Sequence, residues 1–338
     1  MDKTFLVQTA KALVARKKGI LAADESFRST TKRFEAINLP HTIENRLAYR
    51  DMMFTTPGLE EFISGVIMFD ESIRQNAHTG QTFPDYFKAK GMLAGVKVDT
   101  GFFDMAGFPG DKISEGLDGL KTRLEEYKKL GATFAKWRAV IIINKNNPSR
   151  ACIEANAWQL ARYAAICQEM DVMPVVEPDV NMTGDHTQER DEEVTTWLLS
   201  EMMNQLIKQN VYLEGLLVKT NMILSGRDCP VQANVPAVAE ATLRVLKRVI
   251  PSAVPGVVFL SGGQGAQIST ERLDAMHKIG GFPWELSYSY LRSMADPAFE
   301  IWKGDARNFD AAQKELYRRG KMISAAREGK YSPDMEKA

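Results

Sequence analysis

The chain has 338 residues, 44% of them hydrophobic, and its 43 Lys and Arg residues balance its 43 Asp and Glu residues. This balance gives no reason to expect nucleic acid or an anionic membrane as a partner, and no run reaches the ~20 apolar residues of a membrane span. Three scattered cysteines without CxxC spacing and an N-terminus without a long apolar segment favour a reducing, cytoplasmic compartment.

Short apolar runs alternate with longer amphipathic segments along the chain. Most of the runs are almost continuously apolar, which is typical of a parallel sheet covered on both faces. Eight are expected to be strands: Gly19–Ala23, Ile63–Phe69, Leu93–Val98, Phe134–Ile142, Val172–Val176, Leu213–Val218, Val257–Leu260 and Trp284–Tyr288.

Helices are expected between and around these strands. They include an N-terminal helix and the segments Gly116–Leu130, Ser149–Glu169, Glu192–Gln209, Ala233–Val249 and Phe309–Glu328. Ser149 is placed to cap the start of its helix, because its hydroxyl can accept a bond from a free backbone N–H. The polar end of the chain from about residue 330 is expected to fray.

Strands that alternate with helices, without a Pro/Gly/Ser linker, favour one α/β domain over residues 1–338. The number of units predicts a (β/α)8 TIM barrel with extra N- and C-terminal helical segments. A doubly wound open sheet is the alternative. It is less favoured because no GxGxxG follows the first strand, and the glycine cluster Gly262–Gly265 follows the seventh instead.

Charged or phosphate-compatible residues mark the ends of the expected strands, where barrels carry their active sites. In chain order they are Asp24, Lys97, the pair Lys136 and Arg138, Glu177, Lys219, the run Ser261-Gly262-Gly263, and Arg292. Asp70, at the end of the second strand, is interpreted as the start of a helix.

Three neighbouring strands place Glu177 between Lys136 and Lys219, because adjacent strands lie about 4.8 Å apart. Arg138 is two residues after Lys136 and faces the same side. Desolvation lowers a lysine pKa and makes the amine a nucleophile, so the set suggests carbonyl chemistry through a Schiff base. A salt-bridge network that fills the barrel is the alternative interpretation.

Two groups of residues suggest a substrate that carries a phosphate at each end. The backbone N–H groups of Ser261-Gly262-Gly263 and the side chain of Arg292 follow strands seven and eight, where barrels often bind phosphate. Ser29, Lys32, Arg33, Lys97 and Arg138 could serve a second anionic group. The four histidines are dispersed, and none of them ends a strand as a metal ligand would.

Seven segments in order resemble class I fructose-1,6-bisphosphate aldolase, and the resemblance runs from about residue 5 to residue 332. They are Leu21–Ser26, Gly95–Asp99, Phe134-Ala-Lys-Trp-Arg138, Val176–Pro178, Tyr212–Met222, Phe259-Leu-Ser-Gly-Gly-Gln264 and Ser289–Arg292. The FAKWR and FLSGGQ blocks are the most specific of these.

The resemblance implies reversible, metal-independent cleavage of fructose 1,6-bisphosphate to dihydroxyacetone phosphate and glyceraldehyde 3-phosphate, with no cofactor, by a homo-oligomer, favoured as a tetramer over a dimer. It implies that Lys219 forms the Schiff base, Glu177 is the acid/base, Lys136 is a supporting cation and Asp24 assists C3–C4 cleavage. The implied C1-phosphate site is Ser261, Gly262, Gly263 and Arg292, and the other end is lined by Ser29, Arg33, Lys97 and Arg138.

Four positions depart from the family pattern. Asp179 stands where a second Glu is usual, Thr220 where Pro is usual, and Leu291 and Arg28 where Gly is usual. A positive φ at Leu291 would cost energy. The chain also lacks a tail ending in tyrosine, so another group or water is expected to carry the proton of the enamine step.

Other activities stay open at this stage. Sedoheptulose 1,7-bisphosphate and fructose 1-phosphate are alternative substrates. A transaldolase-like or deoxyribose-phosphate aldolase-like enzyme would use the same Schiff-base chemistry, and a non-catalytic scaffold on the same fold is the alternative from another class.

Overall fold

A computed structural model describes residues 1–337, and its centre is a closed barrel of parallel strands in the order β1-β10-β9-β8-β7-β6-β3-β2. The strands are β1 Gly19–Ala23, β2 Ile63–Met68, β3 Leu93–Lys97, β6 Phe134–Ile142, β7 Met173–Asn181, β8 Leu217–Thr220, β9 Gly256–Phe259 and β10 Glu285–Tyr290. Pairing of Ile20 with Ser289 joins the first strand to the last. The predicted TIM barrel is confirmed, and the open-sheet alternative is wrong.

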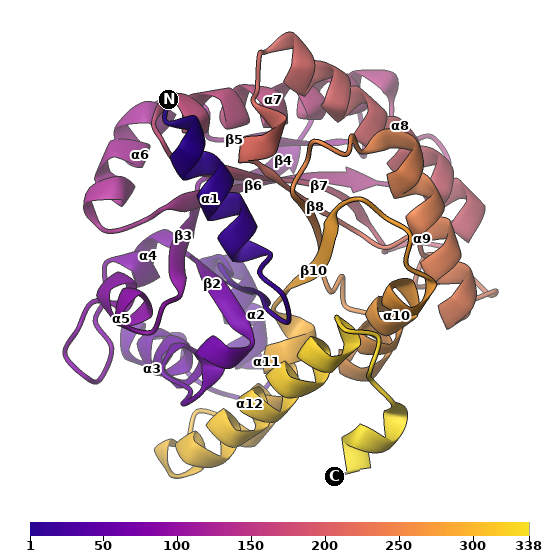
Figure 1. Ribbon diagram of the computed structural model, residues 1–338. Helices are drawn as coiled ribbons and strands as arrows, with labels where there is room; N and C mark the ends of the chain where they lie inside the picture. Colours follow the sequence, from indigo (N-terminus) through magenta and orange to yellow (C-terminus); the bar gives the residue numbers. More distant parts are fainter. Residues whose placement is uncertain (338) are drawn as a thin grey trace.

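Helices surround the ring of strands, as Figure 1 shows. They are α2 Phe27–Glu35, α3 Ile43–Phe54, α4 Asp70–Ile73, α5 Phe83–Ala89, α6 Leu120–Lys129, α7 Arg150–Glu169, α8 Gln188–Lys208, α9 Val235–Val249, α10 Ala266–Ile279, α11 Arg292–Trp302 and α12 Phe309–Ala326. Ser149 caps α7 as predicted, since its side chain accepts a bond from the Cys152 N–H. Asp70 begins α4, which confirms its interpretation as a helix-start residue.

The N-terminal helix α1 (Lys3–Leu13) closes one end of the barrel and crosses the ring of strands in Figure 1. Its Leu6, Ala10 and Leu13 join a buried cluster with residues inside the barrel, among them Phe134 and Leu217. Apolar side chains therefore fill the barrel at the end where its strands begin. The charged residues lie at the opposite end of the barrel, where the strands end.

Three features near the strands differ from the expectation. Strand β7 continues five residues beyond Val176, to Asn181, so that Glu177 lies within the strand rather than after it. Leu213–Gly215 forms a 3-10 turn, η2, so strand β8 begins only at Leu217. The Gln168 side chain accounts for the turn, because its amide donates to the carbonyls of Tyr212 and Gly215. A two-stranded hairpin, β4 (Gly101–Asp104) with β5 (Lys112–Glu115), was not expected at all.

The end of the chain is packed rather than frayed, as far as residue 337. Tyr331 is buried, and its N–H donates to Asp274. Glu336 forms an ion pair with the buried Arg319 and accepts a bond from the Tyr331 hydroxyl. The prediction of a frayed end is therefore wrong. It considered only the polarity of the segment and not its contacts with Asp274 and Arg319.

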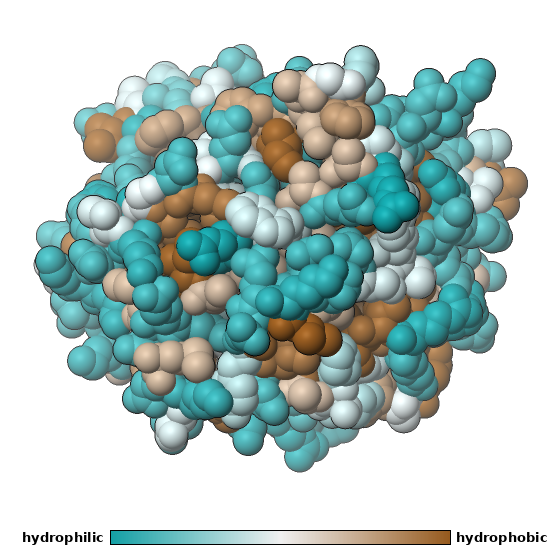
Figure 2. Space-filling model, turned by 90° about the horizontal axis from the view of Figure 1, so that it is seen from above, coloured by the Kyte–Doolittle hydropathy of each residue, from teal (hydrophilic) through white to brown (hydrophobic). Residues whose placement is uncertain are grey.

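The outer surface is mostly hydrophilic on the side of the molecule that lies at the top of Figure 1. Figure 2 shows that hydrophobic residues there form small, separate patches. Within the described residues, no helix combines the length and the apolarity that crossing a membrane requires.

Candidate active site

A cavity of about 1720 Å³ opens at the carboxyl ends of the barrel strands. All of the predicted site residues except Gly263 line it: Asp24, Ser29, Arg33, Lys97, Lys136, Arg138, Glu177, Lys219, Ser261, Gly262 and Arg292. The fold thus brings together residues that are up to 268 positions apart in the sequence, from Asp24 to Arg292.

The floor of this cavity is a buried group of two carboxylates and two amines, which we call the floor cluster (Asp24, Lys136, Glu177 and Lys219). The Lys136 Nζ lies 2.7 Å from Asp24 Oδ2 and 2.9 Å from Glu177 Oε2. The Lys219 Nζ lies 3.2 Å from Glu177 Oε1. The predicted arrangement, with one carboxylate between two amines, is what the structure shows.

The electrostatics of the floor cluster separate the two lysines. Burial and the like charge of Lys136 lower the pKa of Lys219, and together they outweigh the attraction of Glu177. Burial also disfavours the charged form of Lys136, but Asp24, Glu177 and Asp99 raise its pKa above the ordinary value. Lys136 therefore keeps its proton while Lys219 gives its proton up more readily.

Glu177 is ionised in this setting. Burial raises its pKa, but the charges of Lys136, Lys219 and Arg138 more than offset this and bring the pKa to about 2. Before Glu177 can donate a proton, it must therefore receive one during the reaction.

Three of the predicted phosphate-binding cations already have carboxylate partners. Arg138 donates from Nε to Asp179 over 2.7 Å, and Arg33 contacts both Glu25 and Asp296. The Lys97 amine pairs with the carboxylate of Asp99 and donates to its carbonyl oxygen over 2.7 Å. Ser29, by contrast, is exposed in the first turn of α2, with its hydroxyl 3.3 Å from that of Ser26.

The predicted glycine loop has the backbone that a glycine allows. Gly262 and Gly263 have φ values of 58° and 82°, in the left-handed region that other residues avoid. Arg292 begins α11 and lies against Gly263: a methyl group on Gly263 would sit 2.6 Å from Nη1 of Arg292. Gly263 therefore lies beside the cavity with Arg292 between them, although it does not line the cavity directly.

Side chains behind the floor were missed by sequence reasoning. The β7–β8 pairing stops at Val176 with Val218, just before Glu177 and Lys219. Beyond that point Asn221 accepts a bond from the Val180 N–H, and so links the two strands again.

Helix α8 supports this link from outside the barrel. Thr195 accepts a bond from the Asn221 amide, and Asp191 accepts one from the Leu224 N–H over 2.6 Å. Burial raises the pKa of Asp191 to about 7. The only signal in the sequence was Asn221 itself, a polar residue two positions after Lys219.

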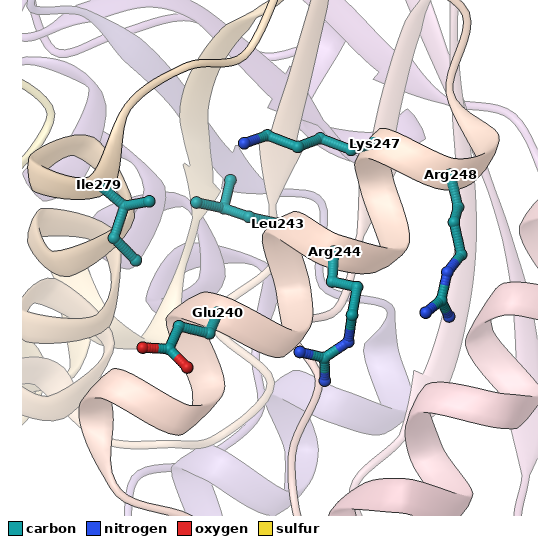
Figure 3. Close-up of a pocket in the computed structure, with 6 residues that line it drawn as sticks. All are labelled: Glu240, Leu243, Arg244, Lys247, Arg248 and Ile279. Atoms are coloured by element: carbon teal, nitrogen blue, oxygen red, sulfur yellow. The ribbon is translucent and has the colours of Figure 1, made fainter.

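A smaller recess of about 420 Å³ lies elsewhere on the surface, between α9 and the end of α10 (Figure 3). It is lined by Glu240, Leu243, Arg244, Lys247, Arg248 and Ile279. Arg244 and Arg248 both pair with Glu192, and no strand-end residue contributes. The barrel cavity is therefore the candidate active site.

Comparison with known proteins agrees with this geometry. The family model described as "Fructose-bisphosphate aldolase class-I" matches residues 5–338. The chain belongs to the class-I fructose-bisphosphate aldolase family. It is accordingly an aldolase, an enzyme of the lyase class.

Relatives of this aldolase cover almost the whole chain. "Probable fructose-bisphosphate aldolase class 1" of Xanthomonas campestris pv. campestris is 49% identical over 327 residues, which is 96% of this chain and 98% of that one. Fructose-bisphosphate aldolase of Dictyostelium discoideum is 44% identical over 97% of this chain and 92% of its own. A crystal structure of fructose-bisphosphate aldolase from Plasmodium falciparum, in complex with TRAP and a small molecule inhibitor, superposes with a TM-score of 0.95 at 41% identity, covering 97% of this chain and 95% of that one.

The structure accommodates all four residues at which this aldolase departs from the family pattern. Leu291 has φ −115°, so the expected cost of a positive φ does not arise. Asp179 is buried as the partner of Arg138, and Thr220 is buried in β8 with its hydroxyl 3.3 Å from Asn221. Arg28 is exposed at the edge of the cavity.

Within residues 1–337, no three His, Cys, Asp or Glu side chains are grouped so that they could hold a metal ion.

Proposed function

We propose that this aldolase cleaves fructose 1,6-bisphosphate reversibly to dihydroxyacetone phosphate and glyceraldehyde 3-phosphate, without a metal ion, through an iminium on Lys219. The observation that carries the proposal is the buried Lys219 amine, whose pKa is lowered and which lies 3.2 Å from a carboxylate at the floor of the barrel cavity.

The first half of the reaction joins the amine to the substrate. Neutral Lys219 attacks the C2 carbonyl, and the carbonyl oxygen gains a proton from solvent to give a carbinolamine. The attacking nitrogen becomes acidic as it forms the new bond, and Glu177 is close enough to take that proton. Glu177 then returns the proton to the departing hydroxyl, so that water leaves and the iminium forms.

This order of steps is consistent with the low pKa of Glu177. The ionised carboxylate has no proton to supply in the free enzyme. It acts first as a base and only afterwards as an acid. Lys136 stays protonated between Glu177 and Asp24 throughout, and so stabilises negative charge on either carboxylate.

The second half of the reaction breaks the C3–C4 bond. The C4 hydroxyl loses its proton, glyceraldehyde 3-phosphate leaves as the aldehyde, and the bonding electrons move into the iminium to form an enamine. We assign assistance in this deprotonation to Asp24, which lies on the Lys136 side of the floor cluster. Protonation of the enamine carbon and hydrolysis of the iminium then release dihydroxyacetone phosphate.

We assign the two phosphates of the substrate to opposite sides of the cavity. Ser261, Gly262, Gly263 and Arg292 receive the C1 phosphate, and Ser29, Arg33, Lys97 and Arg138 line the other end. At the second end the phosphate competes with carboxylates that already hold Arg33, Lys97 and Arg138. The Arg292 end is therefore the stronger anion site.

Borohydride reduction in the presence of dihydroxyacetone phosphate tests the proposal. Mass spectrometry of the wild type should find the reduced adduct on Lys219, and Lys219→Met should give none. Lys208→Met, which removes an exposed lysine that does not line the cavity, is the matched control and should still be trapped. Absence of an adduct in the wild type would overturn the mechanism, as would loss of activity in EDTA that zinc restores.

We further propose that the chain acts as a single barrel domain in the cytoplasm and assembles as a homo-oligomer, a tetramer rather than a dimer. Sedimentation of the purified protein tests the assembly. Relative rates with fructose 1,6-bisphosphate, fructose 1-phosphate and sedoheptulose 1,7-bisphosphate test the substrate, and we expect the first to be cleaved most efficiently.

A further inference from the structure

We propose that Arg227, in the loop between β8 and α9, is a specificity-determining residue that binds the substrate phosphate at the Arg292 end of the cavity. The inference rests on the proposed function for the identity of the substrate. It goes beyond that function by adding a second guanidinium to the phosphate site.

The geometry that suggests this role centres on Gly263. A methyl group placed there would lie 2.6 Å from Nη1 of Arg292 and 3.1 Å from Nη2 of Arg227. Two guanidinium groups therefore converge on one point beside the glycine loop, although Arg227 lies in the loop after β8 and Arg292 begins the helix after β10. We call Arg227 and Arg292 the rim pair.

The rim pair differs from Arg33 and Arg138 in having no counter-charge. Arg33 and Arg138 each form ion pairs with carboxylates. Among residues 1–337, neither Arg227 nor Arg292 has a carboxylate within 4 Å of its guanidinium or a side-chain hydrogen bond. Two neighbouring cations repel each other, so the arrangement is stabilised when an anion lies between them.

The backbone holds Arg227 in place before any ligand arrives. Its N–H donates to the Met182 carbonyl over 2.7 Å, and the N–H groups of Gly226 and Asp228 donate to the carbonyls of His186 and Gly184. A methyl group on Gly226 would lie only 2.3 Å from the Gly184 oxygen, so close packing of the two loops requires this glycine.

The backbone of such a fixed loop loses little freedom on binding, which favours affinity. Arg227 is exposed, whereas Ser261 is buried at the end of β9. The geometry therefore assigns the inner phosphate oxygens to the glycine loop and the outer ones to the rim pair. Planar guanidinium groups suit this task, because each can donate two parallel bonds to a phosphate.

The test compares Arg227→Ala, Arg227→Gln and Arg227→Lys with the wild type. We expect the first two to raise KM for fructose 1,6-bisphosphate about tenfold, with kcat changed less than about twofold. Arg227→Lys should recover part of the loss, because it keeps the charge but not the paired donors. Arg150→Ala, which removes an exposed arginine that does not line the cavity, is the matched control and should leave KM unchanged.

Binding of inorganic phosphate, measured by calorimetry on the unreacted protein, separates this inference from the proposed mechanism. Arg227→Gln should weaken it by about tenfold even if no Schiff base can be trapped. Unchanged phosphate binding and unchanged KM in Arg227→Gln would overturn the inference. A fall in kcat at constant KM would overturn it too, since it would place Arg227 in the chemistry rather than in binding.

Discussion

The floor cluster lines the barrel cavity, whereas the rim pair meets beside its glycine loop, and the charges of the two groups are balanced differently. In the floor cluster two amines and two carboxylates neutralise one another at distances of 2.7–3.2 Å. In the rim pair two guanidinium groups converge on Gly263 without a carboxylate from the described residues.

The difference teaches which task each region can perform. A buried, internally paired cluster sets the protonation state of each member, and here it leaves Lys219 as the amine most ready to react. Two neighbouring guanidinium groups without a carboxylate partner instead attract an anion. Changes in the floor should therefore alter kcat, whereas changes at the rim should alter KM.

The strongest test of this contrast after Lys219 itself is Glu177→Gln. The amide cannot take the proton from the attacking nitrogen or return it to the leaving hydroxyl, so we expect kcat to fall by about 10²–10⁴. Steady-state kinetics with fructose 1,6-bisphosphate measure the change, and KM should stay within a few-fold of the wild type. A variant with normal kcat would remove Glu177 from the mechanism.

The pH profile of Lys136→Met tests how the floor sets the pKa of Lys219. Only the neutral amine attacks, so kcat/KM falls as the pH drops through the Lys219 pKa. Without the Lys136 charge that pKa rises, and we expect the acid limb to move to higher pH, along with a loss of rate.

Lys136→Arg is the matched control for this profile, because it keeps the positive charge. Its acid limb should stay where the wild-type limb lies. An acid limb that does not move in Lys136→Met would mean that burial alone lowers the Lys219 pKa.

At the rim, Arg292→Ala should act on binding. Loss of a charge-assisted hydrogen bond to phosphate predicts a rise in KM of about 10–100-fold with a much smaller change in kcat. The dissociation constant of inorganic phosphate should rise in parallel. A large fall in kcat with unchanged KM would contradict the division between floor and rim.

The smallest effect is expected at Leu291, the neighbour of Arg292. Its φ is −115° and its side chain packs against the core, so restoring the glycine of the family pattern removes contacts and relieves no strain. We expect Leu291→Gly to lower the free energy of unfolding by about 1–2 kcal/mol, measured by urea denaturation. A gain in stability would show that the backbone there prefers glycine after all.

Much of the site could be predicted because the positions concerned are governed by local pattern. Apolar runs that lead into Asp24, Lys136 or Glu177 identify strands whose charged residues meet at one mouth, whatever the details of packing. The family resemblance extended this to Arg292 and the glycine loop. The cap at Ser149 follows from the same local logic, because it needs only the residues beside it.

Predictions failed where a partner distant in the sequence decides the outcome. Leu213 looked like the start of a strand, but Gln168 from α7 holds it in a turn. The polar C-terminal segment looked free, but Arg319 and Asp274 bind it. The composition of a segment describes that segment alone. The conformation of these two segments is determined by their contacts with residues that are distant in the sequence.

The sequence by itself therefore determined the barrel, the order of the strand ends and the amines and carboxylates that share the floor. Only the tertiary structure decided the direction of the Lys219 pKa, because desolvation and the opposing charges of Lys136 and Glu177 depend on burial and distance. It also decided which arginines are already paired and which are not. Arg227 belongs to this second class, since its meeting with Arg292 exists only after two separate loops are folded against Gly263.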